Sequence, residues 1–495
     1  MTYFDYDIGI LGGGAAGLTV ASGSAQIGAK TILIEKENAL GGDCLHYGCV
    51  PSKTLIHSAN VYHQIKTAPL LGLPKMNVPS VEFKPIAQRI AAVIAKIQKH
   101  DSVKRFCELG AKVEFGQAEF TDNHTVELEG RPITAKTWVI ATGSSPAIAP
   151  IDGLKQTSYL TNRDIFSLDK LPASLIILGA GPIGIEMAQA FNRLGSSVTV
   201  VDMGSQILNK EDQDMADQVQ EVLATEGIIF HLNTAILKIS KSGAKKTVML
   251  RGPDNGVSQI SGEALLVAMG RSANVANLGL DQIGVDYDRS GIKVDQRLRT
   301  SQKHIFAAGD VNGGYQFTHA AGYEGGIVVS NAVFHLPRKT NYTWLPWCTY
   351  TDPELASIGM NEKTARKNGI IPKVLLEQFS ANDRSLSENQ TKGHIKLLLD
   401  QKDNPIGVQI FGPRAGDLIS EWVAVLNSGT KLSTIAGAIH PYPTLGEINK
   451  KMAGDLFAPK IFSDPIRKGL KFFFHFKGRA CAPEKTKASE AGEES

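Results

Sequence analysis

Short apolar runs rich in Val, Ile and Leu recur along the chain as far as residue 310. Runs of this length, bounded by glycine or acidic residues, are typical of buried strands. The strands that we expect are residues 6–11, 31–35, 138–142, 174–178, 197–202, 265–269 and 304–308. Helical patterns lie between several of them, so the pattern predicts an α/β protein.

Other segments follow different periods. Residues 54–64 and 83–97 show helical patterns, the second ending near His100, and proline-rich residues 65–80 lie between them as a loop. Residues 111–130 alternate between apolar and polar positions, which predicts an antiparallel hairpin. From about residue 345 the pattern becomes strands alternating with two helices, so we expect a further domain there.

The first strand leads into a Gly-x-Gly-x-x-Gly turn at Gly12, Gly14 and Gly17, and the strand at residues 31–35 ends in Glu35. The first glycine makes the tight turn, the second lets the backbone approach a pyrophosphate, and the third lets the helix pack on the strand. The pyrophosphate would lie at the helix N-terminus, and Glu35 would accept from ribose hydroxyls. These features predict a dinucleotide site.

The same pattern recurs at Gly179, Gly181 and Gly184, followed by a strand that ends in Asp202. Two dinucleotide sites fit one cofactor that stays bound and one that visits. Asp202 suits the free ribose hydroxyls of NAD and repels a 2′-phosphate. Residues 203–210 contain one lysine and no arginine that would bind such a phosphate, so NADH is favoured over NADPH.

Cys44 and Cys49 stand five residues apart, shortly after Glu35. This spacing brings both sulfurs together on a slightly distorted first helical turn, where backbone N–H groups and the helix dipole favour a thiolate. The disulfide formed by such a pair, beside a bound flavin, accepts two electrons together. The pair predicts a flavin–disulfide reductase in preference to a structural disulfide or two buried thiols.

Three further strand ends are candidates for cofactor binding. One apolar strand enters a turn at Thr142 and Gly143, another ends at Gly270, and the strand at 304–308 is followed by Asp310. A carboxylate and backbone amides at such a place can bind the polar chain of a cofactor.

The length of 495 residues allows three domains, and a net charge of +3 gives no support for nucleic-acid binding. With neither a signal peptide nor an apolar segment of about 18 residues, we expect a cytoplasmic protein. Cys107 and Cys348 are predicted to be ordinary buried thiols, and Cys481 stands alone in the tail. No residues are assigned to a resident metal.

Taken together, these motifs resemble the class I pyridine nucleotide–disulfide oxidoreductases, from about residue 6 to about residue 456. The resemblance implies two Rossmann-like domains, for FAD and for NAD, and an α+β dimerisation domain. It also implies a homodimer whose active sites use residues of both subunits. The expected divisions are 1–150 and 279–344 for FAD, 151–278 for NAD(P), 345–460 for dimerisation, and 461–495 for the tail.

The resemblance also implies roles for single residues. Cys49 matches the thiol that faces the flavin, and Cys44 the thiol that exchanges with substrate, as a redox disulfide. Lys53 matches a lysine near the flavin, with Glu186 as its ion-pair partner. A cation there would stabilise the anionic reduced flavin, and the pair avoids an uncompensated buried charge.

The C-terminal segment distinguishes the branches of the family. Glutathione reductase and dihydrolipoamide dehydrogenase carry His-Pro-Thr-x-x-Glu, whereas with Glu447 in register Tyr442 takes the place of that histidine. Mercuric reductase also has tyrosine there, so a metal ion is the expected electron acceptor. His440, two residues earlier, is either an alternative base or a histidine that packs the loop.

Other acceptors remain open, because the sequence has no Cys-x-x-Cys pair and no vicinal cysteines in its tail. They are another metal ion, a quinone, or a disulfide. Dihydrolipoamide dehydrogenase is the alternative enzyme, and a redox-sensing flavoprotein with slow turnover is the alternative of another class.

Residues 467–479 form a basic, aromatic segment. Two interpretations fit it: contact with a membrane surface, or, favoured from the sequence, a terminal helix packed on its own dimer. Residues 484–495 are polar and are predicted to be disordered.

Overall fold

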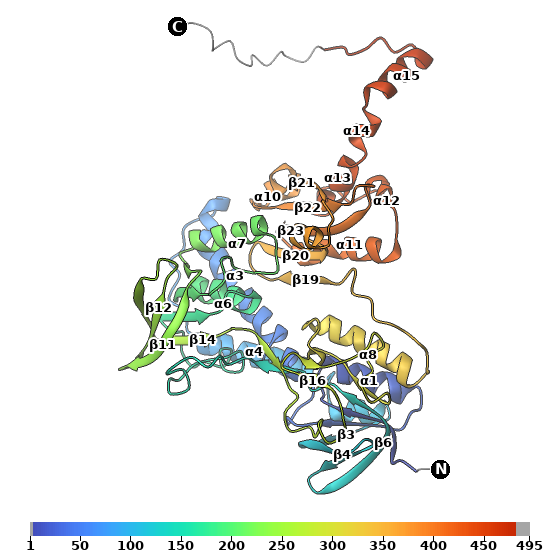
Figure 1. Cartoon of the computed structure of the whole chain (residues 1–495). Helices are drawn as coiled ribbons and strands as arrows, with labels where there is room; N and C mark the ends of the chain where they lie inside the picture. The colour runs from blue at the N-terminus through green and yellow to red at the C-terminus, as the bar shows by residue number, and fades with distance from the viewer. Residues whose placement is uncertain (1–2, 482–495) are drawn as a thin grey trace.

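The computed structural model describes residues 3–481. It contains two α/β parts built on parallel sheets and a third part built on an antiparallel sheet, with a helical extension beyond it (Figure 1). The prediction of disorder for residues 484–495 lies outside the described residues. None of the helices within residues 3–481 is both long and apolar enough to cross a membrane.

The first sheet has seven strands in the order β3-β2-β1-β6-β5-β4, with β18 also paired to β6. Its strands are β1 (Tyr6–Leu11), β2 (Thr31–Glu35), β3 (Ala111–Phe115), β4 (Ala118–Asp122), β5 (Thr125–Leu128), β6 (Arg131–Ile140) and β18 (Ile305–Ala307). The neighbouring strands β3, β2, β1 and β6 pair in parallel, and β18 pairs in parallel with β6. Trp138 is fully buried in this sheet because β6 lies at its centre.

Helices cover this first sheet, and α1 packs against α8. The helices of this part are α1 (Ala15–Gln26), α2 (Gly42–His46), α3 (Cys49–Thr67), η1 (Ala68–Leu71), α4 (Phe83–Gln98), α5 (Val103–Glu108), η2 (Asp310–Asn312) and α8 (Thr318–Ala332).

The second part contains a parallel four-stranded sheet in the order β10-β9-β8-β14 and an antiparallel sheet β11-β12-β13. Its elements are β8 (Ser174–Leu178), α6 (Pro182–Leu194), β9 (Ser197–Val201), α7 (Gln213–Thr225), β10 (Ile229–His231), β11 (Ala235–Ser242), β12 (Lys245–Arg251), β13 (Val257–Gly262) and β14 (Ala264–Val267). Two short pairs complete the sheets: β7 (Ser144–Pro146) with β15 (Arg271–Ala273), and β16 (Tyr287–Asp288) with β17 (Gly291–Ile292).

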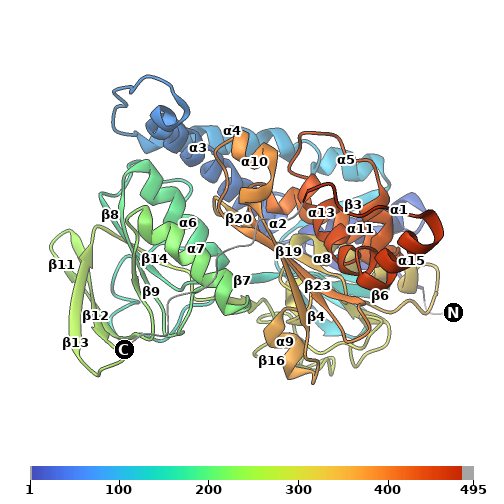
Figure 2. The same cartoon turned by 90° about the horizontal axis from the view of Figure 1, so that it is seen from above.

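The third part is a five-stranded antiparallel sheet in the order β19-β20-β23-β22-β21, and Figure 2 shows it beside the helices α6 and α7 of the second part. Its strands are β19 (Pro346–Thr349), β20 (Glu354–Gly359), β21 (Lys373–Gln378), β22 (His394–Leu399) and β23 (Pro405–Gly412). Its helices are α9 (Glu362–Lys367), η3 (Phe379–Ala381), α10 (Asp383–Ser387), α11 (Ala415–Ser428), α12 (Leu432–Gly437) and α13 (Glu447–Asp455), followed by α14 (Ala458–Ile461) and α15 (Asp464–Phe474).

A buried arginine on α6 holds the three parts together. The guanidinium of Arg193 lies 2.6 Å from Glu226 and 2.7 Å from Asp352, and it donates to Asn60 on α3 at 2.7 Å. Because Asp352 precedes β20 and Glu226 follows α7, this one side chain contacts all three parts.

Several sequence predictions are wrong in detail. Cys107, expected to be a buried thiol, is exposed. Residues 111–115 form β3, a parallel edge strand beside β2, and the hairpin begins only at β4. An alternating pattern indicates a strand with two unlike faces but does not identify its neighbour. The third part also has five helices, α9 to α13, where two were expected; three of these have only five or six residues, too few to show a period. The α/β architecture itself is confirmed, whereas the exact domain limits stay a prediction.

Candidate active site

One large cavity, of about 1680 Å³, opens where the three parts of the chain meet. Its wall includes the carboxyl ends of β1 and β2, the first turns of α3 and α6, and β19. Ligands bind at such a place in α/β sheets. The predicted site residues that line it are Gly12, Gly14, Glu35, Cys44, Cys49, Lys53, Thr142, Gly143, Gly181, Glu186, Gly270 and Asp310.

The two glycine turns have the same geometry. Gly12 and Gly179 have φ angles of +107° and +109°, and a Cβ on either would lie 2.3 Å from a backbone carbonyl oxygen. A Cβ on Gly17 would lie 1.9 Å from the oxygen of Gly12, and one on Gly184 2.0 Å from that of Gly179. Only glycine allows the helix to approach the strand so closely.

The middle glycines instead open to the cavity. A Cβ on Gly14 would have no neighbour closer than 3.9 Å, and one on Gly181 none within 4 Å. They are the N-caps of α1 and α6, so their helices direct free N–H groups to the same space. Both turns therefore fit the pyrophosphate of a dinucleotide.

The two acidic strand ends are held by backbone donors. Glu35 accepts from the N–H groups of Gly13 at 2.6 Å and Glu37 at 2.8 Å. Asp202 accepts in the same way from the second glycine turn at 2.7 Å and from Gly204 at 2.6 Å. Each carboxylate oxygen keeps a further lone pair, so both groups can still accept from ribose hydroxyls. Of the two, Glu35 lines the cavity and Asp202 does not.

The two cysteines belong to two helices, contrary to the prediction of one distorted turn. Cys44 lies in α2 and Cys49 begins α3, because the chain leaves the helical conformation at Tyr47 and Gly48. Both thiols are free, and they are close enough for a hydrogen bond from Cys44 to Cys49.

This hydrogen bond separates the acidities of the two thiols. It lowers the pKa of Cys49 to about 6, with help from the hydroxyl of Thr318 at 3.5 Å and the charge of Lys53. The same bond, together with burial, raises the pKa of Cys44. Near neutral pH the pair therefore holds one thiolate, on Cys49, and one proton, on Cys44.

Lys53 lies one turn after Cys49 on α3 and pairs with Glu186 of α6 at 2.8 Å. Its ammonium also lies 4.4 Å from the centre of the Tyr350 ring, and the N–H of Tyr350 donates to the other oxygen of Glu186 at 2.9 Å. The lysine is about one third exposed and the glutamate is buried. The sequence-predicted pair is therefore formed, and it stands beside the thiolate.

Asp310 lines the cavity and lies among polar partners. It accepts from the hydroxyl of Ser144 at 2.5 Å, and Arg271 lies between it and Asp43 at 3.7 and 3.0 Å. Burial raises the pKa of Asp310.

Tyr442 and Glu447 lie apart from the cavity of the dithiol in the single chain. They line a smaller hollow of about 410 Å³ in the third part. The Tyr442 hydroxyl donates to Asp383 at 2.9 Å, and Glu447 accepts from the N–H of Thr444 at 3.4 Å. Their arrival at the dithiol of a second subunit remains a prediction.

His440 is engaged in a network within the third part. Its Nε2 lies 3.0 Å from Glu421, which also accepts from Asn449 at 2.9 Å. Asn449 in turn accepts from the indole of the buried Trp422 at 2.8 Å. These contacts correspond to the loop-packing role that the sequence left as one alternative.

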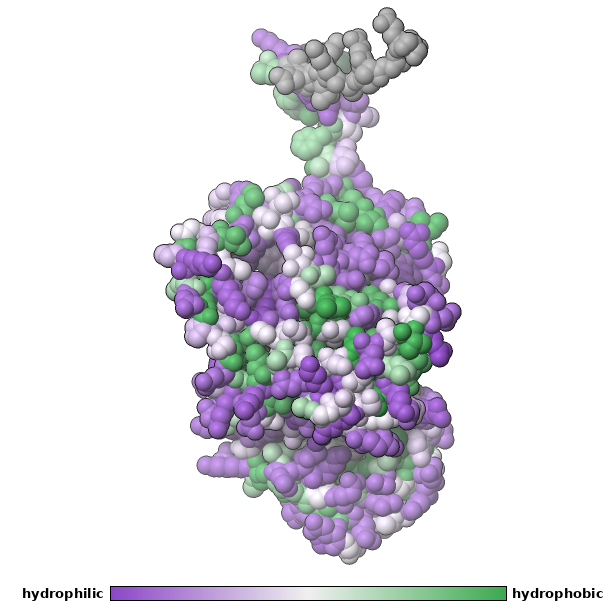
Figure 3. Space-filling view, turned by 90° about the vertical axis from the view of Figure 1, so that its left-hand side faces the viewer, coloured by the Kyte–Doolittle hydropathy of each residue, from purple (hydrophilic) through white to green (hydrophobic). Residues whose placement is uncertain are grey.

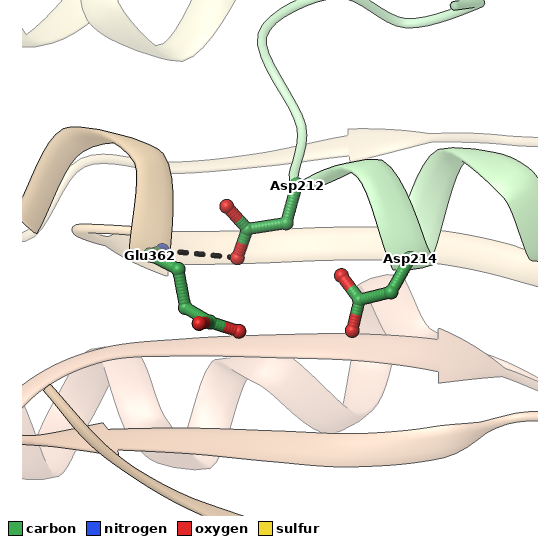
Figure 4. A group of neighbouring side chains, drawn as sticks. All are labelled: Asp212, Asp214 and Glu362. Atoms are coloured by element: carbon green, nitrogen blue, oxygen red, sulfur yellow. Dashed lines mark hydrogen bonds between the residues drawn. The ribbon is translucent and has the colours of Figure 1, made fainter. Parts of the chain in front are cut away.

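Three carboxylates, Asp212, Asp214 and Glu362, lie within 4.8 Å of one another, and Figure 4 shows them directed to a common space. The ammonium of Lys396, itself buried, lies 3.0, 2.9 and 2.7 Å from them. This lysine supplies the positive charge, so the group carries no argument for a metal.

Sequence reasoning missed Thr318, Tyr350, Arg271 and Asp383. A signal existed for Thr318, since it begins the helix that follows the Gly309-Asp310 turn. The others stand in no recognised motif, and their partners lie 59 or more residues away in the chain.

Comparison with known families covers both halves of the chain. Residues 6–325 match the model described as pyridine nucleotide-disulphide oxidoreductase, and residues 345–453 match its dimerisation domain.

Individual relatives support the same family assignment. The chain is 32% identical over 447 residues to mercuric reductase of Bacillus cereus, covering 90% of this chain and 70% of the relative. It is 33% identical over 467 residues to dihydrolipoyl dehydrogenase of Bacillus subtilis (strain 168), covering 90% and 96%. The Cu(II) complex of the HOCl-induced flavoprotein disulfide reductase RclA from Escherichia coli superposes with a TM-score of 0.82 and 28% identity, covering 92% of this chain and all of that one. The chain therefore belongs to the class I pyridine nucleotide-disulphide oxidoreductases, enzymes that use FAD, NAD(P)H and a redox-active disulfide.

Proposed function

We propose that this protein is a homodimeric, NADH-dependent reductase whose Cys44–Cys49 disulfide passes electrons to a metal ion. Bound FAD supplies the two-electron relay between the nicotinamide and the disulfide. The assignment of each residue below belongs to this proposal.

The Cys44–Cys49 disulfide receives the equivalent of one hydride, which is two electrons and one proton. The S–S bond breaks, Cys49 becomes the thiolate, and the proton is held by Cys44. The lowered pKa of Cys49 and the raised pKa of Cys44 support this division. Two electrons then leave for the acceptor, either one Hg(II) or two Cu(II) ions reduced to Cu(I). The disulfide re-forms, and the Cys44 proton is released.

Lys53 would keep a positive charge beside the thiolate and the cofactor. Glu186 and the ring of Tyr350 hold its ammonium in place, at 2.8 Å from the carboxylate and 4.4 Å from the ring centre. An ammonium in this position favours anionic states of nearby groups.

The choice of a metal ion as the electron acceptor rests on Tyr442. Its hydrogen bond to Asp383 raises the pKa of the phenol above its ordinary value of 10. A phenol so protonated cannot serve as a base near neutral pH, as a thiol substrate would require. It can still offer an oxygen to a metal ion held by two sulfurs. Among the similar proteins, mercuric reductase and the Cu(II) complex of RclA fit this direction, whereas dihydrolipoyl dehydrogenase fits the alternative.

Asp202 supports NADH as the donor. Its carboxylate is fixed by two backbone N–H groups at the end of β9, where a 2′-phosphate would be repelled. The adjoining Met203 is exposed and offers no positive charge.

The test is NADH oxidation by the purified holoenzyme with Hg(II), Cu(II), lipoamide, oxidised glutathione and quinones as acceptors. Tyr442→Phe should lower turnover with the metal ion by tenfold or more, an order of magnitude typical for the loss of one contact at a reacting centre. Flavin reduction by NADH, followed by rapid mixing, should not change.

Tyr287→Phe is the matched control, because Tyr287 makes the same kind of hydrogen bond, to Asp281 at 3.1 Å, on a distant surface. Lipoamide turnover that exceeds metal turnover and is undiminished in Tyr442→Phe would instead identify a dihydrolipoamide dehydrogenase. In that case His440 would be the base, and His440→Gln would abolish the activity.

A further inference from the structure

The chain ends in a helical extension, here called the terminal arm, which comprises residues 458–481 with α14 and α15. Figures 1 and 3 show the arm standing away from the body of the protein. Neither α14 nor α15 has a buried side chain. The packing of the single chain therefore gives no reason for the sequence of the arm.

The residues of α15 are segregated by type around the helix. Ile466, Leu470 and Phe473 follow the i, i+4, i+7 spacing that places them on one side. The basic residues Arg467, Lys468 and Lys471 fall together on another side. A helix with separate apolar and basic faces is suited to a boundary between an apolar and an anionic environment.

The apolar side of the arm is large and in contact with solvent. Phe473 and Phe474 extend it, with exposed fractions of 74% and 64%. Phe472, four residues after Lys468, lies beside the basic side, and Phe476 follows the end of the helix; they are 74% and 56% exposed. Exposed apolar side chains gathered in this way mark a site of interaction.

The net charge of the terminal arm indicates which kind of surface could cover it. Residues 464–479 contain five Lys or Arg and one Asp, a net charge of +4, whereas the whole chain carries +3, so the rest of the chain is close to neutral. Within the described residues, the only ion pair of this segment joins Arg467 to Asp464 at 3.4 Å. A second copy of a nearly neutral body would cover the phenylalanines and leave the positive charges unmatched.

We propose that the terminal arm binds the surface of a membrane that contains anionic lipids, with its phenylalanines in the acyl boundary and its lysines and arginines at the headgroups. An anionic bilayer matches both faces at once. The helix, with 11 residues, is too short to span the bilayer and so lies on it. This differs from the interpretation that the sequence favoured, a helix packed on its own dimer.

The test is co-sedimentation of the full-length holoenzyme with vesicles of phosphatidylglycerol and phosphatidylcholine, or of phosphatidylcholine alone. We expect binding to the first that weakens with added salt, and little binding to the second. The triple variant R467Q/K468Q/K471Q should lower the partition coefficient on the order of a hundredfold, since each basic residue near such a surface contributes about fivefold. Phe473→Ser with Phe474→Ser should also weaken binding.

The matched control is K75Q/K84Q/K99Q, which removes the same charge from three exposed lysines of the first part. It should bind vesicles like the unchanged protein, and all variants should oxidise NADH normally. Equal vesicle binding by the arm triple variant and the control would overturn the proposal, as would an absence of binding to phosphatidylglycerol. Light scattering without vesicles tests whether the arm packs on a second copy of the chain. If the phenylalanine variant no longer forms a dimer, the arm binds the second copy, and the membrane proposal is overturned.

Discussion

The acidity of Cys49 in the reduced enzyme gives the sharpest test of the site. A pKa of about 6, against an ordinary thiol value of 9.0, leaves roughly thirty thiolates for each thiol at pH 7.5. An unperturbed thiol would show the inverse ratio. Thr318 contributes through its hydroxyl, 3.5 Å from the sulfur. Thr318→Val removes this contact while keeping the shape of the side chain.

A hydrogen bond to a charged group contributes about 1.5 kcal/mol or more, and one pH unit corresponds to about 1.4 kcal/mol. Thr318→Val should therefore raise the pKa of Cys49 from about 6 to about 7. At pH 6.5 the thiolate fraction would fall about threefold, and at pH 9 it would hardly change. The thiolate is the nucleophile in alkylation, so a higher pKa of Cys49 lowers the alkylation rate at low pH and leaves the rate at high pH unchanged.

The assay is the pH dependence of iodoacetamide alkylation of the reduced holoenzyme, with the Cys49 peptide resolved by mass spectrometry. Thr225→Val is the control, because its hydroxyl bonds a backbone carbonyl on α7, away from the cavity. A midpoint near 9 in the unchanged protein would refute the acidity that we assign to Cys49. An identical midpoint in Thr318→Val would refute the role of the hydroxyl.

Three further predictions concern the charged groups. Glu186→Gln removes a negative charge that raises the pKa of Cys49, so the alkylation midpoint should fall below about 6, and a rise would contradict this. Lys396→Met leaves three carboxylates without their cation and should lower the free energy of unfolding by about 3 kcal/mol in a denaturant titration, whereas Lys373→Met, which removes an exposed ion pair, should change it far less. Asp202→Ala with Met203→Arg should shift the ratio of kcat/KM for NADPH over NADH upward about tenfold; an unchanged protein that already prefers NADPH would contradict the premise.

Much of the architecture follows from local pattern. The ends of β1 and β8, immediately before Gly12 and Gly179, were predictable because a Cβ on either glycine would collide with a carbonyl oxygen, so the position requires glycine. The Lys53–Glu186 pair was found through resemblance to a family rather than through spacing, since 133 residues separate the two.

Features that depend on partners distant in the chain could not be predicted. The parallel pairing of β3 depends on β2, which ends at Glu35, 76 residues before β3 begins at Ala111. The alternation of β3 would suit a hairpin equally well. The short helix α10 depends on a side-chain cap, from Asn382 to the N–H of Ser385, rather than on a hydrophobic period. Its first residue, Asp383, then provides the partner of Tyr442.

The contacts of Arg193 have a consequence for motion. Rotating the nicotinamide-binding part away from the other two would separate the guanidinium from Asp352 and from Asn60. Asp352 is 38% exposed, and Arg193 would keep its pair with Glu226, so losing the contacts to the other two parts costs on the order of 1 kcal/mol. We therefore expect the closed arrangement to be the main population, with an opened form populated by roughly one molecule in six.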